Sequence, residues 1–274
     1  MRNPKVTEYI RRDMKGYRLM SYTEEYSDAA KKTAGRQPVL LTAEEHSKMS
    51  ETDFARYYKS RDELMKWYYQ YISNIDKLEL LPIVVKEVYN SHIERIVSFG
   101  AGPGVLEYFL SLILGKSVYI LAADYDQFLV HNGTKIFTEE NKYLEFKVFD
   151  FYKDSVQELV HKYQPQMAVF FGSACSMDNK TYLAFLKQLR KAGIRKIITF
   201  EAGVLEPGKM FLSGIRLFAH AAVRYILRYP NRDIYACHAW KRSYFELKDI
   251  YRKSGYRERR LKNSIYQYAY VLEI

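Results

Sequence analysis

Short apolar runs alternate with helical segments in this sequence from about residue 94 onward. Parallel strands need connections of a dozen or more residues, so this alternation is typical of a parallel sheet with crossover helices. The predicted strands are Ile96–Phe99, Val118–Ala123, Glu145–Phe149, Met167–Phe171 and Ile194–Phe200, and the predicted helices cover 104–115, 126–139, 153–163 and 179–192.

The pattern changes after the fifth predicted strand. A long helical stretch covers Met210–Leu227, and a second one covers Tyr244–Ser254. Two strand-like runs follow, Arg257–Leu261 and Tyr266–Glu273, with no helix between them. Strands joined so closely must pair antiparallel, so we predict an α/β sheet that is mostly parallel and ends in an antiparallel pair.

The first 93 residues have a different, helical character. Thr42-Ala43-Glu44-Glu45 and Ser50-Glu51-Thr52-Asp53 both have the spacing of a capping box, and apolar side chains recur at helical intervals after the second. A further helix is expected over 80–90, where Pro82 falls in the first turn. We therefore predict two domains, an N-terminal helical cap over 1–93 and an α/β domain over 94–274.

A glycine-rich turn follows the first predicted strand and opens the first predicted helix, in the run RIVSFGAGPGVLEYFL. Gly100, Gly102 and Gly104 allow a tight turn and the close approach of a ligand, and amides at a helix start favour a negative group. Asp124 ends the second strand, where a carboxylate can accept hydrogen bonds from both ribose hydroxyls. Asp150 stands at the end of the third strand. Ligands of open α/β sheets bind at this edge, which predicts a nucleotide-type site.

Two other interpretations of these residues exist. A nicotinamide- or flavin-binding domain also uses a glycine-rich turn and a ribose carboxylate, but its glycines follow G-x-G-x-x-G and not the G-x-G-x-G found here. In a purely structural interpretation, the glycines form a strand-to-helix turn and the two aspartates cap helices.

Residues 94–274 resemble the class I S-adenosylmethionine-dependent methyltransferases. The resemblance rests on the glycine turn and on the acidic residues that end strands two and three. It implies a Rossmann-like sheet of seven strands, mostly parallel with an antiparallel last strand, preceded here by the N-terminal helical extension. It also implies S-adenosyl-L-methionine as the cofactor.

The resemblance implies a role for each residue of the predicted cofactor site. The glycine turn would lie against the methionine part, Asp124 would bind the ribose and Tyr125 would flank the adenine. Asp150 would meet the adenine amino group with Phe151 beside it, and Gly172 would close the pocket after strand four. The complete predicted site is Phe99, Gly100, Ala101, Gly102, Gly104, Asp124, Tyr125, Asp150, Phe151 and Gly172.

Methyl transfer from a sulfonium is an in-line displacement that needs orientation more than acid–base help, although a base assists a hydroxyl acceptor. The candidate bases are Glu201, after strand five, and His238. Strand four ends in FFGSACSMDN, without the Asn/Asp-Pro-Pro-aromatic turn of the family's base-amine methylating members. Asp178-Asn179 is interpreted as a helix cap, and no metal site is predicted.

The net charge of +11, from 43 Lys plus Arg against 32 Asp plus Glu, favours an anionic partner. Arg216, His220, Arg224 and Arg228 stand four apart and form a basic stripe on one helix face, which either meets an anionic or membrane-attached substrate or is a solvated face. The basic tail Arg252, Lys253, Arg257, Arg259, Arg260 and Lys262 raises the possibility of RNA.

These features predict an S-adenosylmethionine-dependent methyltransferase acting on a small-molecule or glycan acceptor. An RNA methyltransferase and a non-catalytic scaffold with this fold are the alternatives, and nucleic acid is not favoured because no RNA-binding module accompanies the domain. Only two cysteines occur and no run of about 18 apolar residues is present, so we expect a cytoplasmic protein without a transmembrane segment. Peripheral membrane contact stays open, and the sequence predicts no oligomeric state.

Overall fold

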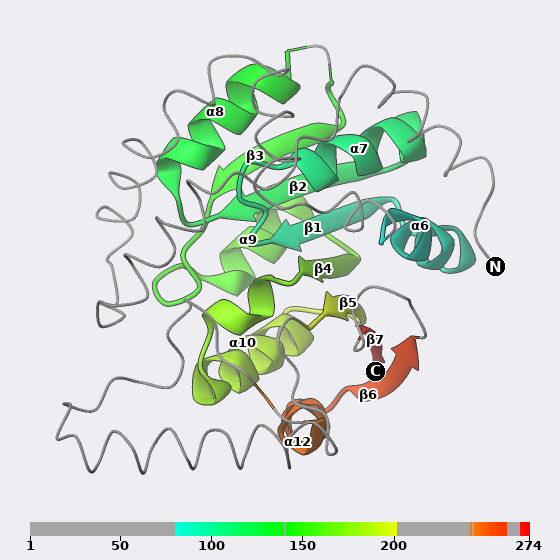
Figure 1. Ribbon diagram of the computed structural model, residues 1–274, viewed down its shortest axis with the longest axis vertical. Helices are drawn as coiled ribbons and strands as arrows, with labels where there is room; N and C mark the ends of the chain where they lie inside the picture. Colours follow the sequence, from blue (N-terminus) through cyan, green and yellow to red (C-terminus); the bar gives the residue numbers. More distant parts are fainter. Residues whose placement is uncertain (1–79, 140, 202–241, 243, 262–268) are drawn as a thin grey trace, which may run out of the picture.

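A computed structural model describes residues 80–139, 141–201, 242, 244–261 and 269–274. Within them, seven strands form one sheet in the order β3-β2-β1-β4-β5-β7-β6 (Figure 1). The strands are β1 (Arg95–Phe99), β2 (Tyr119–Asp124), β3 (Leu144–Val148), β4 (Met167–Phe171), β5 (Lys196–Phe200), β6 (Arg257–Leu261) and β7 (Ala269–Glu273). The helices are α6 (Leu81–Asn90), α7 (Val105–Leu114), α8 (Gln127–Phe137), α9 (Val156–Tyr163), α10 (Asn179–Lys191) and α12 (Tyr244–Ser254), with short 3-10 turns η1 (Gly115–Ser117) and η2 (Ser173–Ser176).

The first five strands run parallel, and β7 runs antiparallel to both of its neighbours, β5 and β6. This confirms the predicted mostly parallel sheet with an antiparallel last strand. Each of the seven predicted strands is found within a few residues of its predicted bounds.

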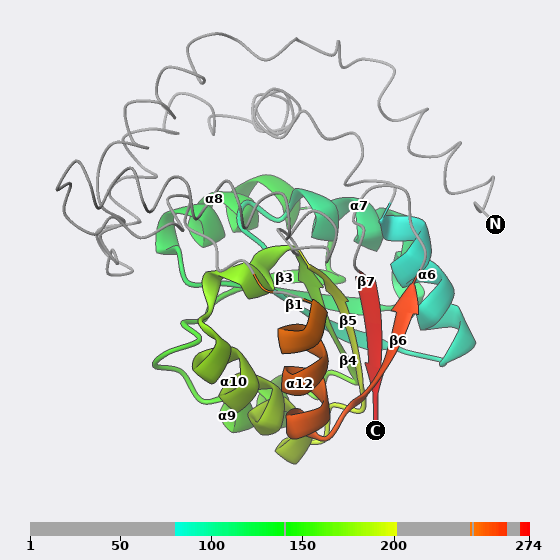
Figure 2. The same ribbon diagram turned by 60° about the horizontal axis from the view of Figure 1, so that its bottom comes forward.

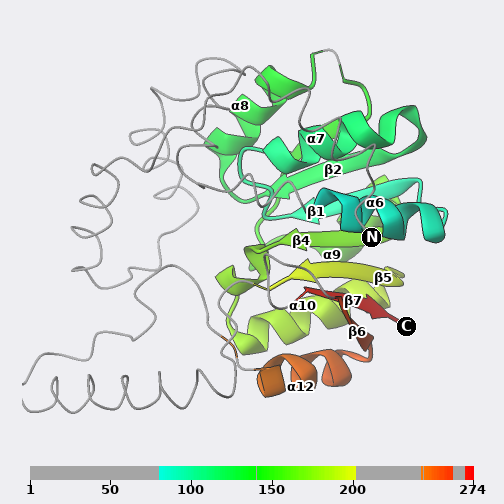
Figure 3. The same cartoon turned by 45° about the vertical axis from the view of Figure 1, so that its right-hand side comes forward.

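Helices cover both faces of the sheet. In Figure 2, α6, α7 and α8 lie on one face, and α9, α10 and α12 lie on the other. In Figure 3, α12 lies beside α10. Successive residues of a strand point to opposite faces of the sheet. Ile96 therefore joins the hydrophobic cluster under α7, and Val97 joins the cluster under α10. Because both faces are covered, β4 is apolar and buried along its whole length, and β1 is buried from Ile96 to Phe99.

The helix α6 is the last helix of the segment 1–93, which the sequence predicts to form an N-terminal cap. It buries Leu81, Val84, Val85 and Val88 in the hydrophobic cluster that also contains the apolar face of α7. The division into a cap and an α/β domain stays a prediction, because residues 1–79 lie outside the described part. No helix of the described ranges combines the length and the apolar character that a bilayer span requires.

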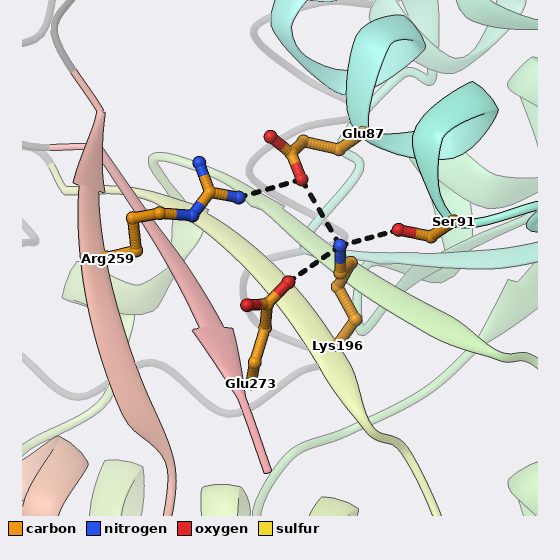
Figure 4. A network of polar contacts seen from close by, with 5 residues as sticks. All are labelled: Glu87, Ser91, Lys196, Arg259 and Glu273. Atoms are coloured by element: carbon orange, nitrogen blue, oxygen red, sulfur yellow. Dashed lines mark hydrogen bonds and ion pairs between the residues drawn. The ribbon is translucent and has the colours of Figure 1, made fainter.

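A polar network ties α6 to the last three strands of the sheet (Figure 4). The ammonium of Lys196 contacts Glu87 Oε2 at 3.2 Å, Glu273 Oε1 at 2.7 Å and the Ser91 hydroxyl at 2.6 Å. Arg259 also reaches Glu87 Oε2, at 2.9 Å. The network therefore fixes the start of the described chain against its end.

Candidate functional site

The glycine turn leaves β1 in a conformation that other residues rarely adopt. Gly100, Gly102 and Gly104 have φ angles of +69°, +57° and +74°, in the left-handed region where glycine has no steric cost. The amides of Gly100 and Ala101 donate to the carbonyl of Ala123, at 2.7 and 3.1 Å. The turn is thereby attached to the end of β2.

Two of the three glycines are also required by packing. A Cβ on Gly100 would lie 2.3 Å from the Cβ of Ser173, and one on Gly104 would lie 2.2 Å from the Phe146 ring. A Cβ on Gly102 would have no atom of the described residues within 4 Å. With respect to the residues that the structure describes, Gly102 is thus the position where a ligand can approach the backbone of the turn.

Asp124 connects the glycine turn to the end of β2. Its side chain is buried, with Oδ2 accepting from the Gly102 amide at 2.7 Å and Oδ1 accepting from the Asp126 amide at 2.9 Å. Asp126 caps α8, accepting from the amides of Phe128 and Leu129. The helix-cap interpretation is therefore wrong for Asp124. A carboxylate can accept about four hydrogen bonds, which allows ribose hydroxyls to bind alongside these amides.

Asp150 lies two residues beyond β3. Its Oδ1 accepts from the Tyr152 amide at 2.9 Å, and its Oδ2 lies 3.6 Å from the Lys153 ammonium. Because Ser155 caps α9, the cap interpretation is wrong for Asp150 as well. The Phe149 amide donates to the Asp124 carbonyl at 2.8 Å, which brings the two acidic turns together.

The Tyr125 hydroxyl lies among these carboxylates. Burial raises its pKa above the ordinary value, and the charges of Asp124, Asp126 and Asp150 raise it further. The hydroxyl therefore stays neutral at physiological pH. The strand ends of β1, β2 and β3 thus bring together the glycine turn, an aromatic ring and two acidic side chains at one edge, as the sequence predicts.

In sequence, the chain matches no protein-family model and no curated protein. In structure, it is similar to the S-adenosylmethionine-dependent methyltransferase SibL, with a TM-score of 0.52 and 12% identity over 80% of this chain and 61% of that one. It is also similar to an O-methyltransferase family 2 protein from Planctomyces limnophilus, solved in complex with apigenin, with a TM-score of 0.52 and 9% identity over 86% of this chain and 63% of that one. The chain has the class I methyltransferase fold. It spans about three fifths of the length of these two proteins, and identities this low establish the fold alone.

An aromatic cluster lies beneath the turns of this methyltransferase fold. The Phe99 ring is fully buried and packs against Phe149, Phe151, Phe170 and Phe185, with centroids 5.1 to 6.0 Å apart. Its carbonyl accepts a hydrogen bond from the Ser173 hydroxyl, next to Gly172. The side chain of Phe99 therefore belongs to the core, so a cofactor contact at this position is limited to its backbone atoms. Phe151 is the partly exposed member of the cluster.

Glu201, one of the two predicted bases, lies just beyond β5 and is buried. Its Oε1 accepts hydrogen bonds from the hydroxyls of Tyr182, Thr199 and Tyr251, at 2.9, 2.8 and 2.7 Å. Burial first, and the charge of Glu201 second, raise the pKa of both tyrosines well above the ordinary value, so they remain donors. Three donors on one oxygen mark Glu201 as an anchor that joins β5, α10 and α12.

Arg242 is a buried residue of this region that the sequence analysis does not single out. Its guanidinium donates to the Asn179 side chain at 2.8 Å and to the carbonyls of Ala174 and Met177, and lies 4.8 Å from the Tyr182 ring centroid. It therefore holds the turn after β4 against the start of α10. A lone arginine outside any periodic pattern has no sequence signal that would reveal this role.

Asp178 confirms its interpretation as a helix cap. Its carboxylate accepts from the Thr181 amide and hydroxyl, both at 2.8 Å, at the start of α10. Burial raises the pKa of Asp178, but hydrogen bonds from Thr181 and Lys180 together with the charge of Arg242 outweigh it and lower the pKa below its ordinary value. Nowhere in the described ranges do three or more His, Cys, Asp or Glu side chains gather to hold a metal ion.

Several predicted residues lie outside the described ranges. They are His238, the basic stripe Arg216, His220, Arg224 and Arg228, and the helices expected before residue 80.

Proposed function

We propose that this protein is an S-adenosylmethionine-dependent methyltransferase that acts on a small-molecule or glycan acceptor. The proposal rests on the hydrogen bond that the Gly102 amide donates to Asp124 at the end of β2. No atom of the described residues lies within 4 Å of a Cβ placed on Gly102, so a ligand can approach the turn at this position. The fold supports it, since one similar structure is a S-adenosylmethionine-dependent methyltransferase and the other is an O-methyltransferase family protein in complex with apigenin.

When bound, the cofactor supplies an activated methyl group on its sulfonium. The open side of Gly102 receives the methionine part, and the Asp124 carboxylate accepts the ribose hydroxyls. The Tyr125 ring flanks the adenine, and Asp150 accepts from its amino group. These residues fix the direction of the sulfonium, which is the main requirement of an in-line transfer.

The base candidates have different roles in this proposal. Glu201 already uses one oxygen for three hydroxyl donors, so we assign it the positioning of α10 and α12 against β5. His238 is then the candidate for removing a proton from a hydroxyl acceptor. Glu201→Gln would lower stability through the lost charge, whereas His238→Gln would lower the rate of methyl transfer to a hydroxyl acceptor.

RNA methylation is the second candidate function. It is favoured by the net charge of +11 and by the exposed basic side chains along the edge strand β6, including Arg257 and Arg260. Radiolabelled methyl transfer into an extract, with and without ribonuclease treatment, separates the two acceptor classes. Label that ribonuclease moves from the macromolecular fraction to the nucleotide fraction supports RNA, whereas label whose distribution ribonuclease leaves unchanged supports the small-molecule or glycan acceptor.

Calorimetric titration of the full chain with S-adenosylhomocysteine tests the proposal. Asp124→Asn removes the charge that would hold the ribose, and we expect affinity to fall about tenfold or more, since hydrogen bonds to charged groups contribute about 1.5 to 3 kcal/mol. Asp126→Asn is the matched control, because it removes the same charge two residues away and asparagine remains a good helix cap.

Three outcomes would overturn the cofactor assignment. They are no affinity of the folded protein for the nucleoside, equal affinities of the two variants, and preferential binding of a dinucleotide. Cofactor binding without methyl transfer to any acceptor fraction would instead favour the scaffold alternative.

A further inference from the structure

A cavity of about 440 Å³ opens at the edge of the sheet opposite the candidate cofactor site. Arg95, Tyr119 and Tyr143 line it from the amino ends of β1, β2 and β3, and Lys116 and Lys162 line it from η1 and the end of α9. Parallel strands place their amino ends together, far from the glycine turn. The volume lies in the range of small-molecule sites, about 300 to 1,000 Å³.

Cations outnumber anions around the cavity. Arg95, Lys116, Lys142 and Lys162 line it together with the carboxylates of Glu94 and Glu145, so four positive charges face two negative ones and the net charge is +2. Within the described part of the chain, no carboxylate forms an ion pair with Lys116 or Lys142. Their charges are thus directed to the cavity and solvent.

The carboxylate of Glu145 is engaged by the wall of the cavity. It accepts hydrogen bonds from the hydroxyl of Tyr119 and, at 3.0 Å, from that of Tyr163. Burial, and then Glu145 itself, raises the pKa of Tyr119 above the ordinary value, so that this hydroxyl remains a donor. Glu145 therefore orients two aromatic side chains, and the lining as a whole keeps its net charge of +2.

Two of the cations also contact Tyr163, the last residue of α9. Arg95 donates to the Tyr163 carbonyl at 3.1 Å, and the Lys162 ammonium lies 4.9 Å from the Tyr163 ring centroid. Cations at a helix C-terminus stabilise its carbonyls, which accounts for these two and for Lys116 beyond α7. Lys142 precedes the edge strand β3 and lies at no helix end, so helix stabilisation does not account for it.

We propose that this cavity binds a small phosphate-bearing molecule, with the phosphate held by Lys116 and Lys142 and an adjoining apolar or ring portion against the tyrosines. Compact ammonium groups on exposed stems suit a phosphate, and the fixed Tyr119 and Tyr163 rings supply a contact surface for the remainder of the ligand. The site is separate from the proposed methyl transfer and does not depend on it.

Calorimetric titration of the full chain with inorganic pyrophosphate at low ionic strength tests this site. Lys116→Gln/Lys142→Gln changes two exposed side chains and is expected to weaken binding about tenfold or more. Lys187→Gln/Lys191→Gln on α10 removes the same charge from exposed positions that do not line the cavity and is expected to retain binding. Affinity should also fall as salt is added, because the ligand is held by charge.

Several outcomes would overturn the proposal. No binding of pyrophosphate by the wild-type protein at millimolar concentration would show that these cations do not form a phosphate site. Equal loss in both double variants would show a diffuse charge effect. Binding of a short RNA that depends on Lys116 and Lys142, without binding of pyrophosphate, would assign the surface to a nucleic acid instead.

Discussion

Replacing Lys196 by methionine should destabilise the protein through the network that closes the sheet onto α6. The lysine side chain is 14% exposed, and its ammonium is shared between Glu87, Glu273 and Ser91. Methionine keeps the apolar stem at a similar length and removes only the charge and its donors. The affected partner is Glu87, whose side chain is 6% exposed.

The loss of stability in Lys196→Met depends on the partners that Glu87 and Glu273 keep. Removing one partner of a buried ion pair costs about 3 to 5 kcal/mol, because a buried charge is left uncompensated. Here Glu87 keeps Arg259 at 2.9 Å, and Glu273 is 43% exposed and can be rehydrated. We therefore expect a loss of about 2 to 3 kcal/mol. A domain of this size loses about 2 to 4 °C per kcal/mol, so Tm should fall by roughly 4 to 12 °C.

Thermal unfolding followed by circular dichroism measures the change. Combining Lys196→Met with Glu87→Gln should cost less than the sum of the two single changes, since the double variant buries no unpaired charge. Lys253→Gln, which removes an exposed partner of Asp249, is the control and should leave Tm unchanged. The reasoning would be refuted by a Lys196→Met protein that has the Tm of the wild type. It would also be refuted by a double variant whose loss of stability equals the sum of the two single losses.

Gly104→Ala should lower Tm more than Gly102→Ala does, because both alanines strain a positive φ but the Cβ at Gly104 also meets a packed ring; equal melting temperatures would contradict the packing argument. Tyr182→Phe removes one of three donors from buried Glu201 and should lower the free energy of unfolding in urea by about 1.5 to 3 kcal/mol. An unchanged urea midpoint would show that Glu201 does not anchor α10 to β5. The depressed pKa of Asp178 stabilises the fold above its unfolded value of about 3.9, and this is lost as pH falls through the folded pKa. Asp178→Asn should therefore be less stable than wild type at pH 7, with a gap that narrows below about pH 4; a gap independent of pH would exclude the charge as its cause.

Local patterns of residues were enough to predict the helices and strands and their order along the chain. Apolar runs and helical spacing are local properties, so the bounds of β4, β6 and α12 agree with their predictions. The short link between the last two strand-like runs likewise required an antiparallel pair, and the cap at Asp178 follows from residue type and position alone. The glycine turn and Asp124 were recognisable because parallel strands bring their carboxyl ends to one edge.

The contacts between side chains that are distant in the sequence could be known only from the folded chain. Glu201 accepts hydrogen bonds from hydroxyls of α10, β5 and α12, and Arg242 joins the turn after β4 to the start of α10, more than sixty residues before it. The cavity at the amino ends of the strands is likewise built from separate turns that carry no motif. These arrangements depend on which faces are buried and which atoms are then left to pair in a low-dielectric interior, and no local pattern of residues encodes either.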